Sequence, residues 1–401
     1  MNQNLYLKNI PKVLAINATW MFVLVMPIVV PFLKSHQLGM QAVYELQAFF
    51  AICVVLLEIP SGYLSDLVGR KQTLVFAGAF IGIGIGLLAI GDSYWWFMVF
   101  ELTLAIAGSL ISGSDIALIY DSLDGTEMQH EQEKEIVGKN IFYSQMAEAL
   151  AALAGGALAF SSLQLPVQVN AVTGWLPFII ALTLQEPPRK KMSRKEHGEN
   201  FRHVYAILFR GSKLMRFTIL GLVFSGTSTL IGVWAFQGYW EAENVPIYYF
   251  GYLWALFNFA VASTARAATF LNRYFGRIIM LWLIALLPVA GYFGMSVLGG
   301  IFGILAGLLL NITRGLATVL LRDDLNQMVE GDIRATANSV TNLGVRLNFA
   351  LMGPLVGAVI DSSGYSLTFA FLAALFAVLL LLIFLPLLRM AKSETNPKMK
   401  G

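Results

Sequence analysis

Charged residues are scarce in this sequence. Only 13% of the 401 residues are Asp, Glu, Lys or Arg, whereas 57% are hydrophobic and the mean hydropathy is +0.69. A soluble chain of this length needs far more polar surface to face water. The composition therefore excludes a soluble protein and predicts a chain that lies in a lipid bilayer.

Cysteine and histidine are scarcer still. The single cysteine, Cys53, excludes a disulfide within the chain and a cysteine-based metal site, and we interpret it as a small buried apolar residue. None of the four histidines lies in a long apolar run, and no zinc-type His/Glu cluster, nucleophile elbow or phosphate loop is present. We therefore expect no enzyme activity, no cofactor, no metal and no ATP site in this chain.

Apolar runs of about 20 residues, the length that crosses a bilayer as a helix, recur about twelve times. They cover roughly residues 12–34, 42–61, 73–91, 95–120, 138–160, 166–184, 214–236, 247–270, 278–297, 299–321, 335–360 and 366–388. The first run is too long for a signal-peptide core and lacks a small-residue cleavage site, so we retain it as a membrane helix. The sequence predicts an all-α integral membrane protein with about twelve transmembrane helices.

Basic residues between these runs concentrate in every second connecting segment, which places them on one side of the membrane. If the N-terminus is cytoplasmic, nearly all of them lie in cytoplasmic segments, and the opposite side keeps only Lys34. This asymmetry predicts an N-in, C-in topology. The net charge of +3 then describes loops that face an anionic leaflet and gives no support to nucleic-acid binding. We expect a monomer in a bacterial inner (plasma) membrane.

A polar, basic stretch that begins QEPPRKK separates the first six runs from the last six. We interpret 1–184 as an N-terminal six-helix bundle, 185–212 as a cytoplasmic linker, and 213–401 as a C-terminal six-helix bundle with a short cytoplasmic tail. An amphipathic helix on the membrane surface is compatible with the same linker role.

The two halves resemble each other. A shift of 207 residues lays TFLNRYFGRIIML (269–281) over GYLSDLVGRKQTL (62–74), so that the Gly-Arg pairs at 276–277 and 69–70 coincide. At a slightly different offset, LLRDDL lies over LIYDSL. The halves are therefore interpreted as repeats of one six-helix unit.

The segment GYLSDLVGRKQTL resembles the signature loop of the major facilitator superfamily, Gly-x-Leu-x-Asp-x-x-Gly-Arg-Lys. The matching residues are Gly62, Leu64, Asp66, Gly69, Arg70 and Lys71. The resemblance implies two pseudo-symmetric bundles around a central cavity, which rock to expose the cavity to each side in turn. It also implies that Asp66 acts as a latch that holds the cytoplasmic side shut.

The residues of this loop fit that role on physical grounds. We expect Gly62 and Gly69 to permit a close approach of backbone, and Pro60 to end or kink the second helix. Glu58 and Asp121 are further candidates to share Arg70. The alternative is that these charges only set topology and solubility.

Ionisable residues inside membrane spans are costly and usually face a cavity or one another. The acids lie in the first half and the arginines in the second: Glu45, Glu58, Glu101, Asp115 and Glu148, and then Arg266, Arg314 and Arg346. Helical rise places Glu148 and Arg346 near mid-membrane and Arg314 slightly toward the cytoplasm. We predict a substrate and proton cavity lined by Glu148, Arg346, Arg314, Glu101, Asp115, Asn342, Asn311, Trp234 and Gln237.

Each assignment has an alternative. Glu148 and Arg346 could form a structural ion pair between the bundles, and Asp115 could be structural. Trp234 could belong to an aromatic belt at the outer interface, an alternative that is stronger for Tyr239 and Trp240.

A cavity with acidic residues on one side and arginines on the other suits an amphoteric substrate, whose carboxylate or phosphate the arginines would bind. Proton coupling would depend on Glu148, Glu101 or Asp115. The helix 5 pattern of drug/proton antiporters is matched only at its end, by Gly155 and Gly156.

The expected function is secondary active transport by alternating access, as proton-coupled export of small amphipathic or zwitterionic organic compounds. Proton-coupled uptake of a metabolite is the alternative within transport. From a different class, a transport-inactive receptor or a lipid scramblase stays open.

Overall fold

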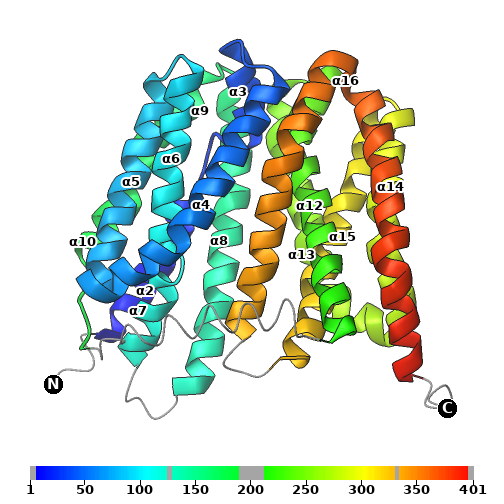
Figure 1. Ribbon diagram of the computed structural model, residues 1–401. Helices are drawn as coiled ribbons and strands as arrows, with labels where there is room; N and C mark the ends of the chain where they lie inside the picture. Colours follow the sequence, from blue (N-terminus) through cyan, green and yellow to red (C-terminus); the bar gives the residue numbers. More distant parts are fainter. Residues whose placement is uncertain (1–5, 124–128, 189–211, 330–333, 396–401) are drawn as a thin grey trace. The chain divides into compact units, whose positions relative to one another are not determined.

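The computed structural model describes residues 6–123, 129–188, 212–329 and 334–395, and within these ranges the chain forms helices and no strands (Figure 1). These described residues form twelve membrane-crossing helical segments, so the expected all-α fold is confirmed. In chain order the helices are α2 (Asn9–Met21), η1 (Met26–Ile28), α3 (Val29–Ser35), α4 (Met40–Val68), α5 (Arg70–Ile90), α6 (Tyr94–Ile111), α7 (Ser114–Leu123), α8 (Gln129–Ala159), α9 (Gln164–Thr173), α10 (Leu176–Leu182), α12 (Lys213–Ala242), η2 (Ile247–Tyr249), α13 (Phe250–Phe275), α14 (Arg277–Val297), α15 (Gly300–Gln327) and α16 (Arg334–Thr395).

Length and apolar composition alone qualify nine stretches of the described chain as membrane spans. The last of them, Thr336–Lys392, is 57 residues long and turns back at Gly364, whose φ of 77° lies outside the helical region. Figure 1 shows this reversal within α16, so the stretch crosses twice. The other two crossings are α8 and α13, whose sequences are more polar than the nine.

The helices form two compact units. One contains the described parts of Met1–Leu38, Glu45–Met192 and Val245–Ala255, and the other contains those of Gly39–Tyr44, Ser193–Asn244 and Leu256–Gly401. Of the expected linker at 185–212, only residues 185–188 and 212 belong to the described chain.

Three of the expected spans are broken rather than continuous. The first is divided into α2, η1 and α3, the fourth into α6 and α7, and the sixth into α9 and α10. Gly113 separates α6 from α7 with a φ of 83°, which glycine adopts without steric cost. At the first break, the amide of Val25 donates to Asn170 Oδ1 (3.4 Å), which replaces a lost helical hydrogen bond inside the bilayer.

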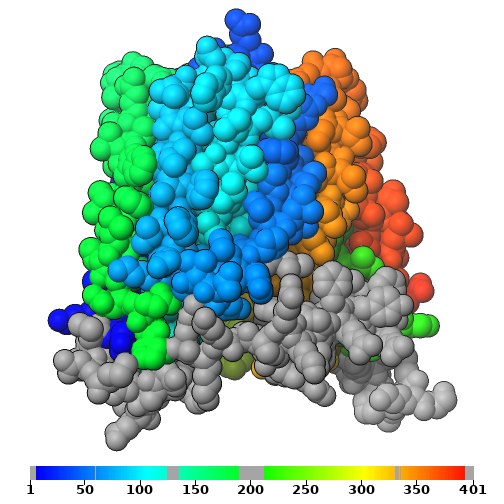
Figure 2. Space-filling model, turned by 60° about the vertical axis from the view of Figure 1, so that its left-hand side comes forward, coloured from blue at the N-terminus to red at the C-terminus, as the bar shows by residue number. Residues whose placement is uncertain are grey.

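Glycines allow α5 to pack closely within the first unit. A methyl group at Gly78 would collide with the backbone of Phe178, and one at Gly82 would collide with the Trp175 ring. On one face, α5 and α6 lie side by side (Figure 2) and expose large apolar side chains such as Ile90 and Trp95. An apolar surface of this kind suits contact with lipid.

In the second unit, α12 and α14 each pack against α15 and α16. The start of α4 also belongs to this unit. The Asp361 carboxylate of α16 accepts hydrogen bonds from the backbone amides of Met40 and Gln41 (both 2.8 Å), and Tyr44 donates to the Ile231 carbonyl (2.7 Å). The carboxylate thus satisfies amides that a helix start leaves unpaired.

Candidate functional site

The signature loop is more helical than its sequence suggests. We expected Pro60 to end or kink the second helix, but α4 continues through Pro60 to Val68 and ends there. The chain turns at Gly69 alone, with a φ of 123° that disfavours any residue with a side chain. Prolines are tolerated inside membrane helices where neighbouring groups satisfy the freed backbone.

Arg70 connects three helices at this loop. Its Nη2 lies 2.8 Å from Asp66 Oδ1, its Nη1 donates to Ser65 Oγ at 2.8 Å, and its Nε lies 3.6 Å from Asp121 Oδ2. Ser114 Oγ of α7 donates to Ser65 Oγ at 2.9 Å. These contacts tie the end of α4 and the start of α5 to α7.

Not every residue of the predicted latch joins this cluster. Glu58 is exposed, and among the described residues Arg70 forms its ion pairs with Asp66 and Asp121 instead. A methyl group at Gly62 would meet no atom within 4 Å, so the close backbone approach expected there is absent. Lys71 takes part in the loop through its backbone amide, which donates a hydrogen bond to the Glu186 carboxylate.

Glu186, which the sequence analysis missed, caps α5. Its carboxylate accepts hydrogen bonds from the amides of Arg70 (2.9 Å) and Lys71 (2.7 Å). A side chain at Gly69 would approach this carboxylate to 3.0 Å and would push it by a few tenths of an ångström, whereas the φ of 123° is what favours glycine there. A negative group at a helix start is favoured by the helix dipole. No sequence pattern links a glutamate after the sixth helix to this loop.

The second unit carries a copy of the arrangement. Gly276 has a φ of 84°, and the next residue, Arg277, begins α14 and forms an ion pair with Asp324 of α15. The structure thus places a glycine, an arginine and a carboxylate in equivalent roles in both halves. Arg273 stands at the position that corresponds to Asp66.

A buried carboxyl group lies between α4 and α6. Glu101 is 4% exposed and accepts a hydrogen bond from Gln47 Nε2 at 2.5 Å. Cys53 is buried nearby against Ala105, as expected for a small apolar residue. Gln47 was not predicted as a site residue, although an amide inside an apolar run is itself a signal.

A second buried carboxyl group joins α7 to α2. Asp115 is 9% exposed and accepts a hydrogen bond from Asn17 Nδ2 at 2.8 Å. The same nitrogen lies 3.0 Å from Asn140 Oδ1 of α8. Asn17 and Asn140 were also missed. In both carboxyl sites the partner side chains are neutral amides.

Glu148 is half-buried on α8 and accepts a hydrogen bond from Trp254 Nε1 at 3.2 Å. Trp254 belongs to the Val245–Ala255 segment, which lies in the same unit as α8. Arg346 and Arg314 belong to the other unit. The sequence predicted a substrate or Arg346 as the partner of Glu148, and the Trp254 indole was not predicted.

Arg314 lies halfway along α15 and is exposed. At about 100° per residue it shares one face of the helix with Asn311 and Thr318. Ile301 and Leu305 are also exposed, but on a face roughly 140° away. An exposed arginine at this depth cannot face lipid without a large cost, so the polar face of α15 borders water-accessible space.

Arg346 has a similar setting on α16. It is half-buried and shares a face with Asn342 and Ser339, which are exposed. Leu347, Leu351 and Leu355 form a separate exposed apolar stripe. Two exposed faces on one helix, one polar and one apolar, indicate that this helix also borders both water and lipid.

The remaining predicted cavity residues lie deeper. Asn311 is 2% exposed, and its Nδ2 has no hydrogen-bond partner among the described residues. Gln237 is fully buried and Trp234 is half-buried. Tyr239 and Trp240 are also buried, so the aromatic belt considered for them is wrong. Trp240 stacks on Phe236 inside the unit because aromatic rings fill its core.

Within the described ranges, no group of three or more His, Cys, Asp or Glu side chains is placed to hold a metal ion. The candidate residues supply separate groups in each unit: carboxyl, amide and indole groups in the first, and guanidinium, amide and indole groups in the second. Carboxyl groups can bind protons, and guanidinium and amide groups can bind polar organic groups.

Comparison with known proteins identifies the family. Residues 13–329 match the family model of the Major Facilitator Superfamily, and no curated protein matches the chain. The nucleoside transporter NupG has a TM-score of 0.73 at 14% identity, covering 96% of this chain and 99% of NupG. A bacterial homologue of the human lysosomal transporter Spinster, inward-facing and unoccupied, has a TM-score of 0.72 at 17% identity and covers 96% of each chain.

A POT family transporter in complex with 5-aminolevulinic acid has a TM-score of 0.65 at 12% identity, covering 95% of this chain and 94% of that chain. At these identities the structural likeness shows the fold alone. The family model covers well over half of the sequence, and the chain therefore belongs to the major facilitator superfamily, as a multi-pass membrane protein of the secondary-transporter class.

Proposed function

We propose that this protein is a proton-coupled transporter that exports small amphipathic or zwitterionic organic compounds by alternating access. Glu101 serves as its principal proton site, and Asp115 as a second. Arg314 and Arg346 bind the anionic group of the substrate, and Glu148 meets its cationic group. The cluster around Arg70 acts as the latch of one gate.

The observation that carries the proton assignment is the pairing of two buried carboxyl groups with neutral amides. Glu101 accepts from Gln47, and Asp115 accepts from Asn17. A buried carboxylate that is paired with a cation cannot be protonated without leaving the cation uncompensated. A neutral amide partner leaves no uncompensated charge when the carboxylate is protonated, so Glu101 can alternate between its acid and its carboxylate form.

The arginines support the substrate class. Arg314 and Arg346 each lie on a polar face that borders water-accessible space, and a guanidinium binds carboxylate or phosphate through two parallel hydrogen bonds. The similar folds described as a nucleoside transporter and as a POT family transporter in complex with 5-aminolevulinic acid indicate that this architecture accommodates small polar organic molecules.

The test begins with ligand discovery. Purified protein is screened by thermal shift against amphipathic and zwitterionic compounds, because ligand binding raises the unfolding temperature. The hits are then assayed in proteoliposomes with an imposed pH gradient. The proposal predicts net substrate movement opposite to proton movement, and no substrate accumulation after the gradient is collapsed.

Each other result identifies a different function. Movement of substrate and protons in the same direction would replace export with proton-coupled uptake. Lipid scrambling that ignores the gradient would establish a scramblase. Saturable ligand binding without flux under any gradient would establish a receptor and contradict transport.

A further inference from the structure

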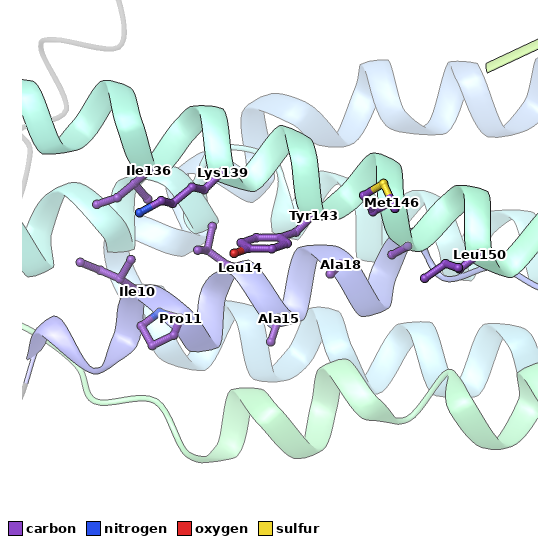
Figure 3. Close-up of a pocket in the computed structure, with 11 residues that line it drawn as sticks. Ile10, Pro11, Leu14, Ala15, Ala18, Ile136, Lys139, Tyr143, Met146 and Leu150 are labelled. Carbon is purple, nitrogen blue, oxygen red and sulfur yellow. The ribbon is translucent and has the colours of Figure 1, made fainter. Parts of the chain in front are cut away.

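A groove runs between α2 and α8 in the first unit, separate from the residues assigned to transport. It has a volume of about 700 Å³, and apolar side chains form most of its lining, among them Leu14, Met146 and Leu150 (Figure 3). Short side chains on both helices, Ala15, Ala18 and Ala147, leave the space open.

The groove lies on the side of α8 that faces away from Glu148. Tyr143, Met146 and Leu150 repeat at spacings of three and four residues, and all three are exposed. Glu148 lies roughly 160° from Leu150 around the helix axis. Exposed apolar residues at membrane depth contact lipid tails, so this groove is open to the bilayer rather than to the polar cavity faces.

The length of the groove matches one leaflet. Eleven residues separate Lys139 from Leu150 on α8, which is about 17 Å at 1.5 Å per residue. Half of a hydrocarbon core of about 30 Å is about 15 Å. Lys139, Ile10 and Pro11 lie together at one end (Figure 3), close to where both helices are predicted to enter the membrane.

This end of the groove carries two opposite charges. Lys139 Nζ lies 2.6 Å from Glu135 Oε1, and the two side chains are 51% and 63% exposed. An ammonium group attracts a lipid phosphate, and the adjacent carboxylate can accept hydrogen bonds from a primary ammonium. The same carboxylate repels a headgroup whose charge is only negative.

We propose that this groove is a binding site for one phosphatidylethanolamine molecule of the leaflet at the N-terminal ends of α2 and α8. One acyl chain lies along Tyr143, Met146 and Leu150. The phosphate contacts Lys139, and the ethanolammonium donates to Glu135. Phosphatidylcholine cannot make the last contact because its quaternary ammonium has no N–H.

The test uses native mass spectrometry of the purified, delipidated chain with dioleoyl phosphatidylethanolamine, phosphatidylcholine or phosphatidylglycerol. The wild-type protein should retain one phosphatidylethanolamine in preference to either of the others. Ala147→Phe fills the groove and should abolish this retention. The matched control is Ala157→Phe, because Ala157 is exposed on the same face of α8 ten residues farther along, in the other leaflet.

The charged pair provides a second test that does not alter packing. Lys139→Gln should weaken phosphatidylethanolamine retention about fivefold, because the variant lacks the ammonium group that attracts the lipid phosphate. Glu135→Gln should reverse the preference, so that phosphatidylglycerol is retained over phosphatidylethanolamine. Both side chains are exposed, so these variants fold even if Ala147→Phe does not.

Two results would overturn the proposal. Retention of phosphatidylethanolamine by a folded Ala147→Phe variant at the wild-type level would show that the lipid does not occupy the groove. Equal retention of all three lipids by the wild-type protein, unchanged in Glu135→Gln, would show that the charged pair does not read the headgroup.

Discussion

Replacing Glu186 with alanine should loosen the start of α5. In the wild-type protein its carboxylate accepts from the amides of Arg70 and Lys71, which have no partner within the helix itself. Loss of a capping side chain costs about 0.5 to 2 kcal/mol, and a favourable charge at a helix start adds about 0.3 to 1 kcal/mol. Because Glu186 is exposed, solvent screens the charge, and we expect a total of about 1 to 2 kcal/mol.

Hydrogen exchange measured by mass spectrometry reads this loss locally. A change of about 1 to 2 kcal/mol raises the open population of the helix start about 5- to 30-fold, so peptides that contain Arg70 and Lys71 should exchange faster by that factor. Glu186→Gln keeps one acceptor oxygen without the charge, so its exchange rate should lie between those of the wild-type protein and Glu186→Ala. Glu58→Ala is the control, because Glu58 is an exposed acid in the last part of α4 and lies outside the cap.

Exchange of these amides in Glu186→Ala within twofold of the wild-type rate would contradict a stabilising role for the cap. Acceleration of the same amides by Glu58→Ala, to the extent seen in Glu186→Ala, would also contradict it. The first result would mean that the carboxylate stabilises these amides no better than water does. The second result would mean that the loss of any negative charge nearby has the same effect.

Three further predictions concern the charges at the loops and in the cavity. Asp66→Asn should reduce transport strongly while expression and ligand binding persist, because it loosens the latch without touching the cavity; normal turnover would contradict the latch. Arg346→Ala should lose substrate binding and Arg346→Lys should regain only part of it, measured by thermal shift, whereas unchanged affinity in a stable Glu148→Gln, Arg346→Gln double variant would remove both from the site. Arg277→Gln and Asp324→Asn should each destabilise the second unit. The double variant should lose less unfolding free energy than the sum of the two single losses, as measured by a double-mutant cycle of unfolding.

The helical fold was predictable because apolar runs of bilayer length are long, strong signals. The copy of the Gly-Arg pair at 276–277 also predicted a real geometric repeat, since Gly276 and Gly69 both have positive φ. Breaks within spans were not predictable in the same way. Gly113 ends α6 through its backbone conformation, and its neighbours Ser112 and Ser114 are small polar residues that also occur inside continuous membrane helices.

The site was harder to predict than the fold. Charged residues inside apolar runs drew attention to Glu101 and Asp115, but their partners Gln47 and Asn17 are uncharged and far away in sequence. Which amide meets which carboxylate depends on how α2, α4, α6 and α7 pack. The cap on α5 is a similar case, because Glu186 is 115 residues from Lys71 along the chain.

The central claim is that Glu101 couples proton movement to substrate movement, and Glu101→Gln tests it most directly. Glutamine has nearly the same shape and can still contact Gln47, but it cannot bind and release a proton. In proteoliposomes, we predict that Glu101→Gln loses substrate movement driven by a pH gradient yet retains exchange of labelled for unlabelled substrate at equal pH on both sides. Gradient-driven transport at the wild-type rate in this variant would contradict the account.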